Sequence, residues 1–237
     1  MQVAFDDGFT FGRGVFETIK VVNKRPLFLK AHLDRLDRGL AFFGLPRQSY
    51  QEQIEEFIAR DEETHYGLKL IVTADNVCLV KRPDPYRDGE EGFTLGLSTV
   101  RRNATSPLTY HKTLCYYDNI YAHQEAQKAG FRSAFFLNEA GELTETAFGN
   151  LFLVCDGEIK TPTVSAGLLA GTMRSYLCAQ YPITEAHLTL DDAKEAEEVF
   201  ISNALMGVQP VTQLGDLAYT IGPRYQQLKK ALAPLGF

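Results

Sequence analysis

Short apolar runs with strand character recur along the chain and alternate with segments of helical periodicity. In the first hundred residues these runs are VFETIKVV, LFL, LKLIVT, NVCLVK and FTLGLSTV. The last three are expected to be strands of one antiparallel sheet, because β-branched and apolar residues favour strands. Leu33, Leu36, Leu40 and Phe43 recur at helical spacing before Gly44, and residues 50–60 are expected to form a second helix. The first half is therefore predicted to be α+β.

The second half repeats this mixture after a polar stretch, RRNATSPLT, which begins at Arg101. We interpret residues 101–111 as the connection between a domain at 1–100 and a domain at 112–237, because polar segments rich in Ser, Thr and Pro join domains. A helix is expected from Asp118 to Ala129, ending at Gly130. Strands are expected at SAFFLN, ELTET, NLFLVCDG and EVFIS, and further helices near Gly171 and Asp191. Both domains are thus predicted to be α+β.

Composition and charge exclude several classes of protein. The net charge is −6 and the basic residues are dispersed, which argues against nucleic-acid or anionic-membrane binding. No window approaches the ~20 apolar residues of a spanning helix, and no signal peptide is visible. The four cysteines are scattered among apolar residues, which favours reduced thiols. We therefore expect a cytoplasmic protein that binds a small molecule.

Two side chains are candidates for covalent and acid–base chemistry. Lys112, in YHKTLCYYDNIYAHQEA, follows a turn-rich stretch and directly precedes a helix. A lysine that forms an imine has to be partly desolvated, although a lysine taken singly is more often a solvated surface residue. Glu145 lies between two strands in a Thr-rich stretch, where it is either a solvated loop charge or the partner of a pyridine nitrogen.

Two turns in the second half are candidates for phosphate binding. Gly171-Thr172-Met173 is expected to open a helix, and Ser202-Asn203-Ala204 is expected to follow a strand and open a short helix. Each could be a plain strand-to-helix turn, in which Gly and Asn are common. Each could equally direct backbone N–H groups at a phosphate.

Four segments now stand out: those around Lys112 and Glu145, and the two turns. In this order along the chain, they resemble the class-IV aminotransferase family. FDDGFTFGRGVFETIKV and AHLDRL match that family as well, so the resemblance extends from Phe5 to about Val211. The family contains branched-chain aminotransferases, D-amino acid aminotransferases and aminodeoxychorismate lyases. The resemblance implies a two-domain α+β fold-type IV enzyme, D-amino acid aminotransferase-like, whose C-terminal domain at 112–237 has a barrel-like sheet. It also implies a homodimer, and pyridoxal 5'-phosphate (PLP) bound between the domains, with no metal.

The same resemblance implies a role for individual residues. Lys112 corresponds to the Schiff-base lysine and proton shuttle, and Glu145 to the partner of the pyridine nitrogen. Arg35, in HLDRL, corresponds to the arginine that binds the cofactor phosphate; without the family it reads as an exposed charge beside a leucine stripe. The two turns correspond to those that give N–H groups to the phosphate, at Thr172, Met173, Asn203 and Ala204. Tyr116 is placed near the phenolic oxygen of the cofactor.

Two segments favour one activity within the family. GTMR and NALMGVQPV match the aminodeoxychorismate lyases, which convert 4-amino-4-deoxychorismate to 4-aminobenzoate and pyruvate for folate biosynthesis. The alternative is an aminotransferase of the branched-chain or D-amino acid type, acting on an amino acid and a 2-oxo acid. A second alternative is a non-enzymatic protein that has lost its reaction, against which the joint presence of Lys112, Glu145 and Arg35 argues.

Three departures from the family bear on the substrate. Arg13 replaces the usual aspartate in FGRG, and it is either a substrate-carboxylate ligand or a surface arginine. TADNVCLVKRP stands where the family often has an Arg-Gly-containing loop. Cys115 replaces the asparagine that often follows the lysine. The residues that bind the substrate carboxylates therefore cannot be carried over from the aminotransferases.

Overall fold

The computed structural model describes residues 2–86 and 92–237. The chain divides into two compact units, which are considered separately. The first comprises Met1–Arg87 with His111–Tyr116, and the second comprises Asp88–Tyr110 with Tyr117–Phe237. The described helices are all too short or too polar to cross a lipid bilayer.

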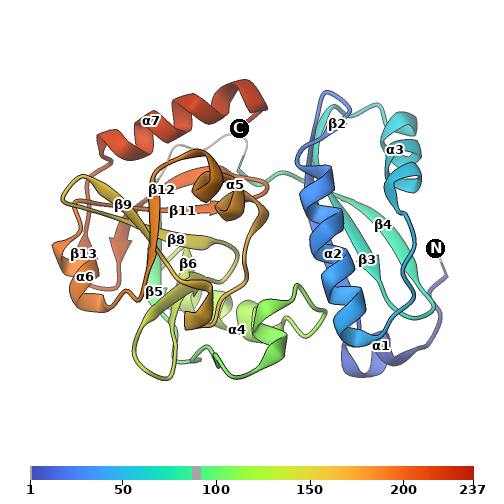
Figure 1. The fold of residues 1–237 in the computed structure, drawn as a ribbon, viewed down its shortest axis with the longest axis horizontal. Coiled ribbons are helices and arrows are strands. Elements are labelled where there is room, and N and C mark those ends of the chain that lie inside the picture. Colours follow the sequence, from blue (N-terminus) through green and yellow to red (C-terminus); the bar gives the residue numbers. More distant parts are fainter. Residues whose placement is uncertain (1, 87–91) are drawn as a thin grey trace. The chain divides into compact units, whose positions relative to one another are not determined.

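The first unit is a four-stranded antiparallel sheet covered by helices (Figure 1). The strands have the order β2-β1-β3-β4. Their bounds are β1 (Val15–Val22), β2 (Arg25–Pro26), β3 (His65–Val72) and β4 (Val77–Arg82). The helices are α1 (Asp7–Phe11), α2 (Leu29–Phe43) and α3 (Gln51–Arg60). Val15, Ile19 and Val21 alternate along β1 and pack with apolar residues of α2 and α3, as expected for a sheet with one covered face.

Local sequence explains where the helices of the first unit begin and end. Gly44 adopts a left-handed conformation (φ 64°) and its N–H bonds to Leu40 and Ala41, which ends α2 at the predicted position. The segment LFL, expected to be a strand, is not one. Phe28 has a left-handed backbone (φ 54°) and Leu29 already begins α2, because the β1–β2 hairpin is too short to extend beyond Pro26.

The second unit contains a closed barrel of six strands in the order β8-β11-β12-β5-β6-β7, closed by pairing of β7 with β8. Strands β9 and β10 extend this sheet beyond β8, and β13 pairs with β12. The bounds of the barrel strands are β5 (Phe93–Leu97), β6 (Ser133–Leu137), β7 (Leu143–Thr146), β8 (Asn150–Cys155), β11 (Glu198–Asn203) and β12 (Gly207–Leu214). The outer strands are β9 (Glu158–Pro162), β10 (Ile183–Ala186) and β13 (Leu217–Ala218). The predicted α+β fold with a barrel-like second sheet is confirmed.

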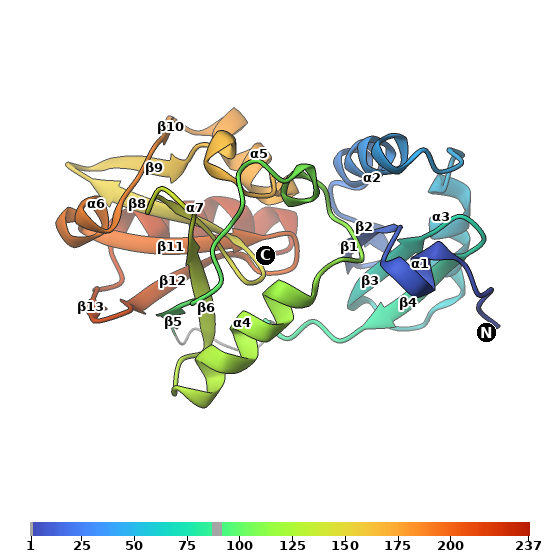
Figure 2. The same cartoon turned by 90° about the horizontal axis from the view of Figure 1, so that it is seen from below.

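Helices pack on the outside of this barrel (Figure 2). The α-helices are α4 (Tyr117–Lys128), α5 (Thr172–Gln180), α6 (Leu190–Glu195) and α7 (Pro223–Leu232). Short 3-10 turns occur at η1 (Pro107–Tyr110), η2 (Val164–Ala166) and η3 (Ala233–Leu235). α4 packs on β6, α5 on β11, and α7 on β12. The rings of Phe152 on β8 and Phe200 on β11 are buried and stack with their centres 4.8 Å apart.

One strand lies in a different sheet from the predicted one. The run FTLGLSTV was expected to join LKLIVT and NVCLVK, but β5 pairs in parallel with β12 and β6 in the second unit. Conversely, the segment around Lys112 belongs to the first unit, since Phe16 N–H donates to the Lys112 carbonyl (3.0 Å). The unit boundaries therefore do not follow the expected divisions at 100 and 112, because pairing partners distant in sequence leave no local pattern.

Candidate functional site

Lys112 is held in the first unit by backbone bonds to β1. Phe16 N–H donates to its carbonyl, and Leu114 N–H donates to the carbonyl of Gly14 (2.9 Å). A Cβ atom on Gly14 would lie 2.8 Å from Leu114, Thr73 and Val72 atoms, so only glycine lets this segment approach β1 so closely. Lys112 is thereby fixed against the strand.

The Lys112 side chain lies against two aromatic rings. Its Nζ is 4.4 Å from the centre of the Phe16 ring and 5.0 Å from the centre of the Tyr116 ring. These rings meet edge to face, with centres 5.2 Å apart, and Lys112 is half-buried. The environment is that of a partly desolvated amine rather than a solvated surface lysine. Sequence reasoning identified Tyr116 but missed Phe16, which only its position on β1 reveals.

Arg35 is buried in an ion pair with Glu17. Its Nε donates to Glu17 Oε1 (2.7 Å) and its Nη2 to Glu17 Oε2 (2.6 Å), while His32 Nδ1 lies 2.6 Å from Oε2. Arg35 is only 8% exposed, so its interpretation as an exposed charge is wrong. This bidentate geometry fixes the plane of the guanidinium.

The charges of this cluster shift the pKa of two of its members. Burial raises the pKa of Glu17, but Arg35 and His32 outweigh burial and lower it to about 2. Burial lowers the pKa of His32, Glu17 opposes this, and the positive charges of Arg35 and Lys112 lower it further. The cluster therefore contains an ionised carboxylate, a guanidinium and an imidazole whose pKa is lowered. Among residues 2–86 and 92–237, the buried His32 Nε2 has no hydrogen-bond partner.

Glu145 lies on β7 in the second unit and is buried, 8% exposed. Its Oε1 is 3.1 Å from Arg102 Nη2, and its Oε2 accepts from Leu169 N–H (3.2 Å). The Arg102 guanidinium lies 3.8 Å from the centre of the Phe136 ring. Glu145 is therefore a structured buried carboxylate, not a solvated loop charge. Sequence reasoning missed Arg102, which lay in the stretch interpreted as a linker.

The first candidate phosphate turn begins a helix as predicted. α5 starts at Thr172, with Gly171 preceding it in an extended conformation. Thr172 Oγ1 is buried and has no hydrogen-bond partner among the described residues, and Met173 is completely buried. A Cβ on Gly171 would lie 2.2 Å from Asn150 Oδ1, so this turn requires glycine. The N-terminus of α5 thus presents a buried hydroxyl beside free first-turn N–H positions.

The second candidate turn does not open a helix, contrary to the prediction. Asn203 ends β11 and pairs with Gly207 at the start of β12, so residues 203–207 form a hairpin turn. Asn203 Oδ1 accepts from Leu205 N–H (2.9 Å) and Met206 N–H (2.8 Å). This local bonding offers the backbone an alternative to a helix. Ala204 lies within the same turn.

The two turns and Glu145 are neighbours in the barrel through Asn150. Asn150 is the pairing partner of both Glu145 on β7 and Ser202 on β11, and it borders Gly171. Its Nδ2 donates to the Leu169 carbonyl (2.8 Å). Ser202 Oγ, like Thr172 Oγ1, is buried without a partner among the described residues. The barrel thus brings together the predicted residues of the second unit, including Ser202 of the second turn, and adds Asn150, which sequence reasoning missed.

Arg13 has partners of its own within the first unit. Its Nη1 is 3.2 Å from Asp7 Oδ2 and its Nη2 donates to the Phe43 carbonyl (2.9 Å). These contacts connect α1 with the end of α2, as expected of a structural surface arginine. We therefore leave Arg13 out of the substrate site proposed below.

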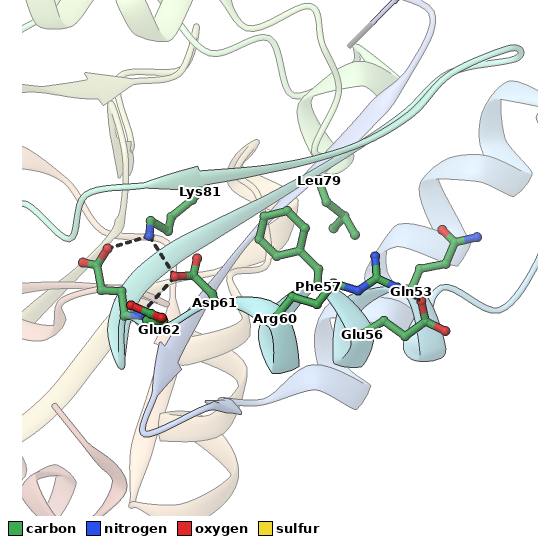
Figure 3. Close-up of a pocket in the computed structure, with 9 residues that line it drawn as sticks. Gln53, Glu56, Phe57, Arg60, Asp61, Glu62, Leu79 and Lys81 are labelled. Carbon is green, nitrogen blue, oxygen red and sulfur yellow. Dashed lines mark hydrogen bonds and ion pairs between the residues drawn. The ribbon is translucent and has the colours of Figure 1, made fainter.

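A surface depression at α3 and β4 has no part in this arrangement (Figure 3). It is lined by Gln53, Glu56, Phe57, Arg60, Asp61, Glu62, Glu63, Leu79 and Lys81. Its charges pair with one another, since Lys81 Nζ is 3.0 Å from Asp61 and 2.8 Å from Glu63. None of the predicted site residues lines it. Across the described parts of the chain, no group of three His, Cys, Asp or Glu side chains could hold a metal ion.

Comparison with known proteins identifies the family. The model of amino-transferase class IV matches residues 14–214. The chain is 28% identical to an aminodeoxychorismate lyase from Vibrio harveyi over 235 residues, covering 87% of this chain and 85% of the relative. It is 26% identical to a D-alanine aminotransferase from Listeria monocytogenes over 244 residues, covering 92% of this chain and 84% of the relative.

A solved structure agrees with this placement over nearly the whole chain. The 4-amino-4-deoxychorismate lyase of Pseudomonas aeruginosa superimposes with a TM-score of 0.89 at 25% identity, covering 99% of this chain and 95% of that one. The matched region contains Lys112, Glu145 and both turns. The chain belongs to the amino-transferase class IV family of PLP-dependent enzymes.

Proposed function

We propose that this enzyme is an aminodeoxychorismate lyase, which converts 4-amino-4-deoxychorismate to 4-aminobenzoate and pyruvate. The observation that carries this choice is the presence of two segments, GTMR and NALMGVQPV, that resemble the aminodeoxychorismate lyases. The β3–β4 connection bears on the substrate. It is a tight turn over residues 73–76, in which Thr73 N–H donates to the Asn76 carbonyl and Asp6 bonds to Thr73, Asp75 and Asn76. It contains no cation where the family often has an Arg-Gly-containing loop.

The described residues fit PLP. Thr172 Oγ1 and Ser202 Oγ are buried polar atoms without hydrogen-bond partners in the described parts of the chain, at the two turns where a phosphate is expected. Buried hydroxyls are normally hydrogen-bonded, and phosphate oxygens would satisfy both. The N-terminus of α5 adds N–H donors and the positive end of a helix dipole. We propose that Thr172, Met173, Asn203 and Ala204 hold the phosphate there, together with Arg35.

Lys112 and Glu145 would divide the chemistry. Bound PLP supplies an electron sink for charge that develops at the amine-bearing carbon. Lys112 is the covalent attachment point and moves the proton at that carbon, a contribution of ~10²–10⁴-fold. Glu145 is kept in place by Arg102 and Leu169 N–H. Its carboxylate would accept a hydrogen bond from the protonated ring nitrogen of the cofactor. We propose that Tyr116, which borders Lys112, bonds the phenolic oxygen.

The remaining steps convert the substrate into its two products, and no second substrate is needed to balance the atoms. The ring carbon bearing nitrogen loses a proton to Lys112, and the neighbouring carbon–oxygen bond breaks. The departing enolpyruvyl group takes a proton on its methylene carbon and leaves as pyruvate, while the ring becomes the aromatic 4-aminobenzoate. Stabilisation of charge by preorganised groups is expected to dominate the barrier.

The competing proposal is an aminotransferase, favoured by the D-alanine aminotransferase among the relatives. Half-reactions distinguish the two activities. The loaded enzyme is mixed with 4-amino-4-deoxychorismate, and pyruvate and 4-aminobenzoate are measured. In parallel it is mixed with amino acids alone, and the cofactor spectrum is followed. Catalytic release of both products supports the lyase; stoichiometric cofactor conversion by an amino acid without pyruvate release overturns it.

We also infer a homodimer from the family resemblance. Analytical ultracentrifugation of the loaded enzyme would measure its mass in solution. A species of one chain, 26.5 kDa, across the accessible concentration range would contradict this.

A further inference from the structure

The face of the first sheet opposite α2 and α3 carries a second lysine beside Lys112. In the β1–β3 register, Phe16 lies opposite Ile71 and Thr18 lies opposite Lys69. Since side chains alternate along a strand, these four share one face of the sheet. The opposite face carries the core residues that pack with α2 and α3. Lys69 and Phe16 therefore project from the same side of adjacent strands.

One aromatic ring borders both lysines. Lys69 Nζ lies 4.4 Å from the centre of the Phe16 ring, and Lys112 Nζ lies 4.4 Å from the same centre. Two ammonium groups thus lie beside a single ring. Lys69 is half-buried, and this burial, with a smaller effect of Arg82, lowers its pKa.

Lys69 differs from the neighbouring lysines in having no carboxylate. Lys20, on the same face, forms an ion pair of 3.1 Å with Asp84. Lys81, on β4, pairs with Asp61 and Glu63. Within residues 2–86 and 92–237, no carboxylate oxygen lies within 4.0 Å of Lys69 Nζ. A partly desolvated charge without a counter-ion is unfavourable unless a ligand compensates it.

Two candidate cations for a substrate carboxylate do not serve. The β3–β4 turn at residues 73–76 has none, and Arg13 is bonded to Asp7 and the Phe43 carbonyl. Lys69 lies on β3, four residues before that turn begins, and has no carboxylate partner among the described residues. It stands on a strand, where backbone pairing on both sides fixes its position.

We propose that Lys69 Nζ binds a carboxylate of the substrate across the Phe16 ring from Lys112. This proposal rests on the proposed function only in taking the substrate to be an amine that carries a carboxylate. In the lyase the ligand is the substrate dicarboxylate and its product 4-aminobenzoate. The Phe16 ring supports the aliphatic part of the ligand or its ring, and Lys69 determines that an acid is bound in preference to a neutral analogue.

The test compares an acid with its neutral isostere. Binding of 4-aminobenzoate and of 4-aminobenzamide to the loaded enzyme is measured by calorimetry for wild type, Lys69→Met, Lys69→Arg and Lys81→Met. Methionine keeps an unbranched apolar chain against Phe16 but removes the charge. We expect Lys69→Met to weaken 4-aminobenzoate binding about tenfold or more, as for loss of one charge-assisted bond, and to leave 4-aminobenzamide unchanged. Lys69→Arg should restore much of the affinity, and Lys81→Met should match wild type.

The outcomes separate this proposal from the proposed function. Each variant is first checked for thermal unfolding, cofactor absorbance and the hydride-trapped adduct on Lys112, none of which should change in Lys69→Met. Equal affinity of wild type and Lys69→Met for 4-aminobenzoate overturns the role of Lys69. If the enzyme loads cofactor but transaminates instead, KM for the 2-oxo acid is compared in the same variants. An increase in Lys69→Met that Lys69→Arg reverses supports the role, and an unchanged KM overturns it.

Discussion

Arg102 and Glu145 form a buried ion pair, with Arg102 Nη2 3.1 Å from Glu145 Oε1 and each side chain 10% exposed. The guanidinium also stacks on Phe136, and Arg102 N–H donates to the Leu137 carbonyl (2.9 Å). Arg102 is therefore anchored by three independent contacts. It is a positioning residue for the carboxylate that we propose to face the cofactor nitrogen.

Replacing Arg102 by methionine should leave Glu145 as a buried charge without its partner. We expect the free energy of unfolding to fall by about 3–5 kcal/mol, the usual cost of breaking a buried pair from one side. Urea unfolding of the apo-protein measures this. The double variant Arg102→Met, Glu145→Gln should recover part of the loss, because no charge then remains unpaired. Purely additive losses would show that the two residues do not interact.

Removal of the Lys112 amine should abolish turnover while leaving the fold intact. We expect Lys112→Ala to reduce kcat by about 10²-fold or more, because proton transfer by a positioned group is lost. Borohydride treatment followed by mass spectrometry of peptides should find the cofactor on the Lys112 peptide of wild type. Lys160→Ala, on the outer strand β9, is the control and should retain full activity. An adduct on another peptide would refute the assignment.

Replacing Thr172 by valine should change stability and cofactor affinity in opposite directions. Thr172 Oγ1 is buried and finds no hydrogen-bond partner among the residues that the structure describes, so an apolar isostere should stabilise the apo-protein by about 1 kcal/mol. If the hydroxyl binds phosphate, the same change should weaken PLP binding several-fold, as measured by titration of the apo-protein.

Thr161→Val provides the matched control, because Thr161 is also buried but donates to the Leu151 carbonyl (2.8 Å). This variant should lose stability and keep its affinity for PLP. Unchanged PLP binding in Thr172→Val would exclude its hydroxyl from the phosphate site.

The Glu17 carboxylate should make the fold sensitive to acid. Its pKa is about 2 in the folded protein, against 4.5 without the fold, so the unfolded chain takes up the proton first as pH falls. The stabilisation from Glu17 is therefore complete above pH 4.5 and is lost as pH falls towards 2. Glu17→Gln should lower stability at neutral pH and flatten this acid dependence. Glu52→Gln, at an exposed position of α3, should keep the wild-type slope.

Several features were readable from the sequence because they depend on neighbours along the chain. The leucine spacing and Gly44 predicted the end of α2, and Gly171 predicted the start of α5. Strands β1, β3, β4, β6 and β8 coincide with the predicted apolar runs. Capping, glycine conformation and hydrophobic periodicity are local properties, so the residues that carry them suffice.

Other local expectations were wrong where two local interactions competed. Residues 203–207 were expected to start a helix, yet the Asn203 side chain closes a hairpin between β11 and β12. The run LFL was expected to be a strand, but Phe28 turns the chain directly into α2. In both cases a turn determines the local structure, and the pattern of apolar residues does not specify that turn.

The sequence by itself determined many of the helices and strands, the family resemblance, and Lys112, Glu145 and the α5 turn as candidates. Only the tertiary structure decided that β5 joins the barrel, that Phe16 borders both Lys69 and Lys112, and that Arg102 pairs with Glu145. These relationships join residues separated by tens of positions. These relationships depend on strand register and on the pairing of buried charges. Neither register nor burial is defined until the chain has folded.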